Sequence, residues 1–300
     1  MICLRNLLYA MICVACWSIS PSFANSESVS GVGDLYISSF KEEMYKSSVD
    51  DMGKFIIYDI LVFLIGASLY YIFVERRNKG RRYESVLKFL FPRHVLKSRT
   101  FKTDIWNFAF RRVFATPFFA TGFAVIAFLI GGSLNEALIG FYGRRSPVTD
   151  SLGIVVAVQF LSILLAKSLS EYWVHRLMHD TPIFWSFHRV HHSAEALSIF
   201  TRGRTTFGEL LIIEPILTGF ASLGLGLSTY LLGAELNPWA ISILFVVNMT
   251  TGIYAVFTHT HIPVSFGKLN YIFAGPVLHH IHHSAERRHH DKNYATDFAL

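Results

Sequence analysis

Residues 55–74 read FIIYDILVFLIGASLYYIFV, and Asp59 is the only charged residue in this stretch. A helix of about 20 predominantly apolar residues is long enough to cross a bilayer, since each residue adds about 1.5 Å to its length. The stretch therefore predicts a membrane-spanning helix. The whole chain agrees with this, because 52% of its 300 residues are hydrophobic and 16% are charged, whereas average domains contain about 25% charged residues.

Four further stretches have the length and apolar composition of a span. The last two are separated only by GAELNP, which is too short for anything but a tight helical hairpin. We therefore predict an all-α fold: a polytopic membrane helical bundle with a cytoplasmic histidine-rich helical cap. The four stretches are residues 113–134, 151–168, 210–232 and 239–257.

The N-terminal residues 1–24 resemble a targeting segment. They combine Arg5, an apolar stretch (7–19) and the small-residue pattern SFA before Asn25. This layout is typical of a secretory signal peptide, and an uncleaved signal anchor is the alternative. Both place residues 25–54 in an extracytoplasmic segment. The three cysteines all lie within the first 16 residues, so we expect neither a disulfide framework nor a cysteine-based metal site.

The charges that flank the first span predict its orientation. Residues 75–112 carry 12 Lys and Arg against 3 acidic residues, whereas residues 25–54 carry 3 Lys against 6 acidic residues. The positive-inside rule places the basic stretch in the cytoplasm. It contains no nucleic-acid-binding motif, so we interpret it as a determinant of topology and of affinity for anionic lipid. When the spans are followed from there, residues 175–192 and 259–290 both emerge on the cytoplasmic side.

Histidine is unevenly distributed, because only one of the 14 precedes residue 175. The first cluster is a pair four residues apart, a spacing that places both rings on one face of a helix. The pattern H-x-x-H-H then occurs twice, combining two rings one turn apart with an adjacent ring that points about 100° away. The tripeptide HTH lies between the two copies. The residues are His175 and His179, then His188, His191 and His192, then His259 and His261, and finally His279, His282 and His283.

This number of imidazoles predicts two metal ions rather than one. One metal ion takes about four to six ligands, fewer than the clustered histidines supply. Imidazole binds zinc, copper, iron and nickel, so the ligand type alone does not choose among them. All-nitrogen ligation beside a membrane favours redox chemistry on an apolar substrate.

The motifs HRLMH, HRVHHS and HHIHHS, with DKNY downstream, resemble those of the fatty acid hydroxylase/sterol desaturase superfamily. The resemblance covers about residues 150–296 and implies an integral-membrane, histidine-ligated di-iron oxygenase. Zinc in place of iron is expected in a purified form, since it accepts the same ligands. The ligands that the resemblance implies are His175, His179, His188, His191, His192, His259, His279, His282 and His283.

Three neighbouring residues are candidate additional ligands or residues that contact a ligand. Glu171 stands near the place of a family aspartate, and either orients His175 or is a solvated glutamate at the membrane surface. The family often shows R-x-H-P-x-E after the second motif, but this chain reads RTTFGE, with Thr206 at the histidine position. A metal ion there either loses one ligand or takes His261 instead. His280 falls at a variable family position, at the surface or beside a ligand.

The resemblance implies O2-dependent hydroxylation, or desaturation, of a C–H bond in a lipid such as a fatty acyl chain or a sterol. Residues 150–300 form the predicted catalytic domain, and residues 55–149 supply membrane spans and a basic cytoplasmic loop. The sequence shows no flavin or nicotinamide fingerprint and no cytochrome domain, so we expect a separate electron-donor protein. No nucleic-acid partner is expected. The predicted location is a bacterial inner membrane or an ER-like membrane, with the metal site on the cytoplasmic side.

The alternative class is a histidine-rich membrane protein that binds or transports metal without oxygenase activity. A transporter is expected to place ionisable ligands near the bilayer midplane, whereas these spans are nearly free of acidic residues. A bis-histidine haem protein needs only about two to four facing histidines, which leaves the repeated H-x-x-H-H unexplained. A zinc-loaded relative with a structural role uses the same ligands, so the sequence does not separate it from an iron enzyme.

Overall fold

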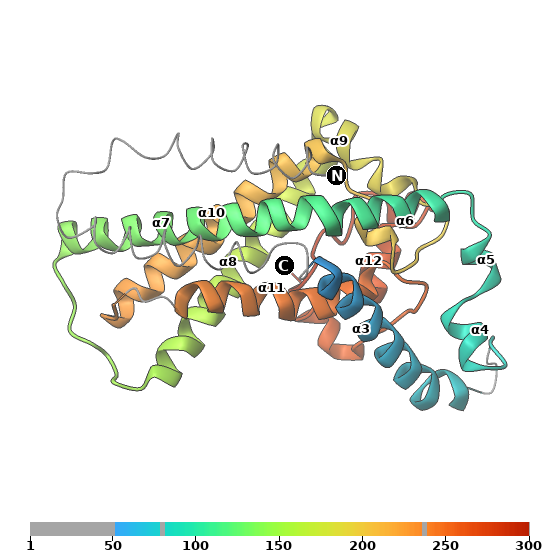
Figure 1. Cartoon of the computed structure of the whole chain (residues 1–300), viewed down its shortest axis with the longest axis horizontal. Helices are drawn as coiled ribbons and strands as arrows, with labels where there is room; N and C mark the ends of the chain where they lie inside the picture. The colour runs from blue at the N-terminus through green and yellow to red at the C-terminus, as the bar shows by residue number, and fades with distance from the viewer. Residues whose placement is uncertain (1–51, 79–81, 236–238, 300) are drawn as a thin grey trace. The chain divides into compact units, whose positions relative to one another are not determined.

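The computed structural model describes residues 52–78, 82–235 and 239–299 (Figure 1). The predicted targeting segment and almost all of the predicted extracytoplasmic segment lie outside the described residues. Residues 50–300 belong to one compact unit. The described part is helical and forms no sheet, with one isolated antiparallel bridge between Phe273 and Phe298. The predicted all-α class is therefore confirmed.

Five long helices overlap the five predicted spans. Three of them are long and apolar enough to cross a membrane, namely Ile56–Arg77, Leu152–Asp180 and Phe207–Leu232. The chain is thus an integral membrane protein with several spans. The five helices are α3 (Met52–Phe73), α7 (Thr116–Tyr142), α8 (Leu152–Asp180), α10 (Phe207–Leu232) and α11 (Trp239–Thr258).

Shorter helices connect the long ones and carry most of the histidine motifs. The helix α6 continues through a π-helical segment, η2, directly into α7, and together they form the longest rod in Figure 1. The short elements are η1 (Glu75–Arg77), α4 (Val86–Leu90), α5 (Arg93–Leu96), α6 (Phe101–Phe110), η2 (Arg111–Ala115), α9 (Pro182–His188), η3 (His191–Ser193), η4 (Thr201–Gly203), η5 (Gly267–Tyr271), α12 (Pro276–His282) and η6 (Arg287–His289).

Small residues let α10 pack closely against both α7 and α8. A Cβ atom added to Gly226 would lie 2.4 Å from the carbonyl oxygen of Gly131 on α7. A Cβ atom added to Gly224 would lie 2.7 Å from the carbonyl oxygen of Ser162 on α8. Such close backbone contact is typical of helix pairs in membranes, where packing rather than apolar burial drives association.

Asp59, the one charged residue of the first predicted span, is buried and paired. Its carboxylate forms a salt bridge with Arg112 of η2, and a second one with Arg202 of η4 at 3.8 Å. A charge within a membrane segment is costly unless it is paired. The pairing therefore ties α3 to the start of α7 and to the loop that precedes α10.

The histidine-rich segments meet at one end of the bundle. His175 and His179 lie in the last two turns of α8, Glu209 lies in the first turn of α10, and His259 directly follows α11. The helices α9 and α12 and the turn η3 complete this end as a helical cap. The predicted cap is confirmed, whereas its placement on the cytoplasmic side stays a prediction.

Candidate metal centre

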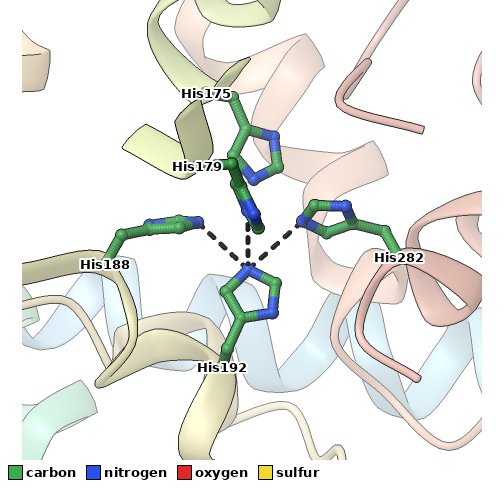
Figure 2. A group of neighbouring side chains, drawn as sticks. All are labelled: His175, His179, His188, His192 and His282. Atoms are coloured by element: carbon green, nitrogen blue, oxygen red, sulfur yellow. Dashed lines mark hydrogen bonds between the residues drawn. The ribbon is translucent and has the colours of Figure 1, made fainter. Parts of the chain in front are cut away.

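The nine predicted ligands form two groups, in each of which one ring nitrogen per residue lies within 4.8 Å of the others. We call them the five-histidine group and the four-histidine group. Figure 2 shows the first, to which α8, α9, η3 and α12 contribute. The five-histidine group consists of His175, His179, His188, His192 and His282, and the four-histidine group of His191, His259, His279 and His283.

The two H-x-x-H-H motifs each divide between the groups. His188 and His192 enter the five-histidine group, whereas the intervening His191 enters the other. His279 and His283 likewise share the four-histidine group, and His282 points to the first. The expectation that adjacent histidines face different metal ions therefore agrees with this placement. The partners within a group are four residues apart, rather than the three suggested by the motif. His188 ends α9 and His192 lies in the following η3 turn, whereas His279 lies in α12 and His283 directly follows it.

Ring nitrogens converge at the centre of the five-histidine group. The Nε2 atom of His192 lies 3.1 Å from that of His188, 3.2 Å from that of His179 and 3.2 Å from that of His282 (Figure 2). An imidazole nitrogen carries either one proton or one lone pair, so these three contacts are not all hydrogen bonds. Metal–nitrogen bonds of about 2.1 Å place neighbouring ligands about 3.0 Å apart. The spacing therefore fits a shared metal ion.

The outward nitrogens of this group are occupied by acceptors. The Nδ1 atom of His175 donates to the carbonyl oxygen of Tyr294 at 2.7 Å, and that of His282 donates to the carbonyl oxygen of Lys292 at 2.7 Å. A carbonyl accepts only, so each ring keeps its proton on Nδ1 and its lone pair on Nε2. The Nε2 atom of His175 is buried and has no hydrogen-bond partner within the described structure. Such a buried lone pair without a hydrogen-bond partner fits a ligand of a metal ion.

Carboxylates support the two remaining helical ligands of the group. The Nδ1 atom of His188 lies 2.7 Å from Oε1 of Glu209, and both side chains are at most 5% exposed. The Nδ1 atom of His179 lies 3.3 Å from Oδ1 of Asp291. A carboxylate at the outer nitrogen fixes the ring and raises the basicity of the inner nitrogen. This group therefore has the arrangement typical of a metal site.

The four-histidine group is a second, more deeply buried convergence. The Nε2 atom of His259 lies 2.9 Å from those of His191 and His279, and the Nε2 atoms of His279 and His283 are 3.0 Å apart. Thr258 fixes His259, because its hydroxyl donates to the Ala255 carbonyl and accepts from Nδ1 at 2.9 Å. The donor set again suits a metal ion that prefers nitrogen ligands.

Burial keeps these imidazoles neutral. It lowers the pKa of His191, His279 and His283 well below the usual value, and neighbouring imidazoles lower these values further. Burial also lowers the pKa of His282, to about 4. A histidine must be neutral to bind a metal ion, so the environment prepares the rings for that role.

The structure places the three additional candidates outside both groups. His261 uses its Nε2 atom to donate to the Phe89 carbonyl at 2.7 Å, and its ring packs against Phe89 and Tyr83. The Nε2 atom of His280 lies 3.3 Å from the Phe257 carbonyl. His261 therefore does not replace a ligand, because it lies in neither group and its Nε2 atom is hydrogen-bonded to the Phe89 carbonyl.

Glu171 belongs to neither histidine group. Its carboxylate pairs with Lys167 at 2.5 Å and accepts from the Thr296 hydroxyl at 2.7 Å. Neither of the two expected roles, orienting His175 or lying solvated at the surface, matches these contacts. Glu171 instead joins α8 to the last described residues of the chain.

Thr206, at the histidine position of the family pattern, begins α10. Its hydroxyl accepts from the Glu209 backbone nitrogen at 3.1 Å, and the Glu209 side chain accepts from the Thr206 backbone nitrogen in return. This capping box satisfies two backbone donors at the start of the helix. The pattern T-x-x-E was visible in the sequence and would have identified Glu209, which our sequence analysis missed.

Arg204 fixes the turn that carries His191 and His192. Our sequence analysis assigned this residue no role. Its guanidinium donates to the Val190 carbonyl at 2.9 Å and to the Ser193 hydroxyl at 2.8 Å. It also pairs at 2.5 Å with Asp104, whose side chain is fully buried. Ser193, which follows the first H-x-x-H-H motif, therefore has a structural role, because it binds the guanidinium of Arg204.

Comparison with known proteins identifies the same region. The family model described as Fatty acid hydroxylase matches residues 160–300, which include both histidine groups. No solved structure matches the chain.

Three curated relatives resemble the same half of the chain. Ornithine lipid hydroxylase OlsE of Rhizobium tropici is 29% identical over 146 residues, which are 48% of this chain and 40% of that protein. Alkylglycerol monooxygenase of Homo sapiens is 28% identical over 134 residues, 45% of this chain and 27% of that protein. Very-long-chain aldehyde decarbonylase GL1-10 of Oryza sativa subsp. japonica is 27% identical over 144 residues, 48% and 44% of the two. The chain thus spans less than half the length of these relatives.

Proposed function

Because residues 160–300 belong to the fatty acid hydroxylase superfamily, we propose that this membrane protein is an oxygenase that hydroxylates a C–H bond of a lipid. The reaction uses O2 and electrons from outside the chain. The observation that carries this proposal is the convergence of nine buried or half-buried imidazoles into two neighbouring groups. Such a pair of nitrogen-rich sites suits two redox-active metal ions.

The metal ions of the proposal are two irons, one in each group. When bound, they supply the site at which O2 is activated. Four or five imidazoles would hold each ion, and Glu209 and Asp291 orient the rings of His188 and His179 through their Nδ1 atoms. Zinc accepts the same ligands, so a purified form is expected to contain some zinc.

The lipid substrate of the proposal reaches the site from the bilayer. Histidines of the two groups lie at the ends of helices α8 and α11, and a bound acyl chain would run along these helices. Trp185 of α9 lies with its ring 5.1 Å from that of His179 and 5.6 Å from that of His192. It covers the five-histidine group and excludes water from that side.

The substrate class is supported by the relatives. Their names describe a hydroxylase of ornithine lipid, a monooxygenase of alkylglycerols and a decarbonylase of very-long-chain aldehydes. All three substrates carry long apolar chains, which fits a site at the end of membrane spans. We therefore propose that the substrate is a lipid with a long alkyl or acyl chain. We favour hydroxylation over desaturation as the reaction, because two of the three names describe oxygen insertion.

A separate donor protein supplies the electrons in this proposal. The basic stretch 75–112 carries exposed cations on α5 and on the turn before α6, including Arg93, Lys97 and Arg99. Positive charge attracts an acidic partner and speeds its association. The positive-inside count supports a cytoplasmic location of this stretch and of the metal site, in a bacterial inner membrane or an ER-like membrane.

The proposed domain organisation follows from the same placement. Residues 150–300 carry all nine ligands and form the catalytic domain, and residues 55–149 pack beside it through α3, α6 and α7. A metal-binding or transport role without oxygenase activity is not favoured. The histidines lie at the span ends rather than mid-bundle, and the relatives are enzymes.

The test is anaerobic loading of the purified full-length protein with iron, followed by Mössbauer spectroscopy. Two coupled irons per chain are expected. A haem absorption band, or one bound zinc per chain with no uptake of iron, would contradict the proposal. Lipid analysis of cells with and without an active protein then identifies the hydroxylated product.

A further inference from the structure

The five-histidine group has a support that the histidine motifs do not reveal: residues 291–297, which we call the strap. Three ligands of this group direct their Nδ1 atoms at it, namely His179 toward Asp291, His282 toward the Lys292 carbonyl and His175 toward the Tyr294 carbonyl. The Tyr294 ring packs against the same three imidazoles, with centroids 5.2 to 5.8 Å apart. None of the described hydrogen bonds of the four-histidine group reaches the strap.

The strap runs antiparallel to one stripe of α8. Residues four apart lie on the same helical face, so Lys167, Glu171, His175 and His179 form a line along it. The contacts follow in reverse order along this face of α8: Asp291 at His179, Tyr294 at His175, Thr296 at Glu171 and Asp297 at Ser168.

The far end of the strap is fixed by a buried charged cluster. Lys167 pairs with Glu171 at 2.5 Å and lies 4.0 Å from Asp297, and all three side chains are at most 18% exposed. The Thr296 hydroxyl donates to Glu171 at 2.7 Å, and the Ser168 hydroxyl donates to Asp297 at 3.1 Å. Buried charges are costly unless paired, and the proposed reaction uses none of these groups. Their retention therefore needs another explanation.

The strap needs such an anchor because its near end is strained. Asp291 and Asn293 have positive φ angles of 54° and 58°. Residues with side chains rarely adopt this conformation, although Asp and Asn tolerate it best. The two turns aim the Asp291 carboxylate and the carbonyls of Lys292 and Tyr294 at the histidines. A conformation of this kind persists only where surrounding contacts hold it.

We propose that the Lys167–Glu171–Asp297 cluster is an anchor that sets the strap, and through it the orientation of His175, His179 and His282. Thr296 and Asp297 are thus positioning residues for the five-histidine group alone. The four-histidine group is set separately, since Thr258 fixes His259 from within α11. This inference rests on the proposed two-metal function and adds that the two metal sites are tuned by different parts of the chain.

The experiment measures Co(II) affinity in two full-length backgrounds that each keep one group. Replacing His279 and His283 with Ala leaves the five-histidine group, and replacing His175 and His179 with Ala leaves the four-histidine group. Affinity is measured by chelator competition and by the ligand-field absorption of Co(II). In the first background, Thr296→Val is expected to lower the affinity about 10- to 100-fold, the usual effect when the groups that orient metal ligands are disturbed. In the second, it is expected to change nothing.

Matched variants separate positioning from general damage. Thr296→Ser keeps the hydroxyl and is expected to restore the affinity. Thr258→Val removes the partner of His259 and is expected to give the reverse pattern, weakening only the four-histidine background. Ser168→Ala is a milder change at the other strap contact and replaces Thr296→Val if that variant lowers the thermal stability of the metal-free protein.

Two outcomes overturn the inference. An equal loss of affinity in both backgrounds means that Thr296 supports the whole cap, and no loss in either means that the strap does not orient the ligands. If neither background binds Co(II) while the unmutated protein also binds none, the two-metal function itself fails. That result is distinct from a failure of the strap alone, in which the unmutated protein binds two Co(II) ions and each background binds one with an affinity that Thr296→Val does not change.

Discussion

The Nδ1 atom of His188 and Oε1 of Glu209 lie 2.7 Å apart, and both side chains are almost fully buried. The Glu209 carboxylate contacts two groups at once, because it also accepts from the Thr206 backbone nitrogen at the start of α10. One residue thus links the geometry of a ligand to the beginning of a membrane helix. The hydrogen bond to an ionised acceptor is of the stronger, charge-assisted kind.

Glu209→Gln is expected to lower the affinity of the five-histidine group for metal about 10- to 100-fold, because the charge behind His188 is lost. The amide has one acceptor oxygen in place of two, so it keeps only one of the contacts to Nδ1 and to the Thr206 backbone. The Thr206 hydroxyl still accepts from the backbone nitrogen of residue 209, so this half of the helix cap is kept. Titration of the purified protein with Co(II) measures the affinity. Glu209→Ala serves as the comparison, since it removes the carboxylate half of the capping box together with the partner of His188. Equal metal affinity in Glu209→Gln and the unmutated protein would show that the charge is unimportant.

Breaking the pair of Arg204 and Asp104 is expected to destabilise the cap. Asp104→Asn leaves the buried guanidinium of Arg204 without a charged partner, and such a loss costs about 3–5 kcal/mol. Thermal unfolding in detergent measures the change. Because Arg204 also holds the turn at Val190 and Ser193, the metal content is expected to fall in both histidine groups.

The control replaces both charges with apolar residues of similar size, Asp104→Leu with Arg204→Met. Removing a buried pair together is often nearly neutral. If the double variant keeps its stability but still loses metal, the network acts on the turn itself. If it keeps both, the pair is only a structural contact.

Much of the architecture could be predicted from the sequence. The five long helices overlap the five apolar stretches. A helix that crosses a membrane needs about 20 apolar residues in a row, and such a run is easily recognised in a sequence. The clustering of histidine from residue 175 onward predicted two metal ions, and the resemblance of the motifs to the fatty acid hydroxylase/sterol desaturase superfamily selected the nine residues that converge in two groups. Both signals are local in the sequence, so neither required knowledge of the fold.

The supports of the histidines could not be predicted in the same way. His175 donates to the carbonyl of Tyr294, which lies 119 residues further along the chain. Every residue has a backbone carbonyl, so no sequence motif identifies this partner. Glu171 was assigned by its distance from His175, but a partner 125 residues away, Thr296, takes its carboxylate. Long-range contacts of single groups depend on how the elements pack, which the pattern of residue types does not specify.

Acid is expected to destabilise the metal-free protein steeply. Burial holds the pKa of His282 at about 4 and that of His191, His279 and His283 well below its usual value in the folded state. Unfolding returns each ring to about 6.5. Below that pH the unfolded chain binds more protons, so stability present above pH 6.5 is lost as the pH falls toward 4. Each histidine contributes up to about 1.4 kcal/mol per pH unit.

The measurement is the thermal midpoint of the metal-free protein between pH 7.5 and 4.5, chosen to span the usual pKa of histidine. The replacement of His279 and His283 with Ala removes two of the titrating groups and is expected to flatten the dependence. A midpoint that does not change below pH 6.5 would mean that these rings are accessible to protons in the folded protein.

Two histidines in similar sequence surroundings are expected to differ sharply in importance. His191→Ala removes a member of the four-histidine group, so turnover is expected to disappear while the protein still inserts in the membrane. His280→Ala removes a ring whose described hydrogen-bond contact is the Phe257 carbonyl and which lies in neither group. This variant is expected to keep two metal ions per chain. The metal content of both purified variants is the decisive measurement, because it reports the site even before a substrate is identified.

The exposed cations of the basic stretch 75–112 are expected to bind the electron donor. Arg93, Lys97, Arg99 and Lys102 are all exposed, and Arg99 has a weak contact to Glu195 at 3.9 Å, close to the turn that carries His191 and His192. Replacing all four with Ser is expected to raise the KM for an acidic electron donor and to reduce the effect of salt on turnover, since association between opposite charges is screened by ions. The turnover number at saturating donor is expected to stay within about a factor of two, because no metal ligand is changed. Reduction of the protein by dithionite, which needs no docking, is the control. An unchanged KM with an unchanged salt dependence would place the donor elsewhere on the protein.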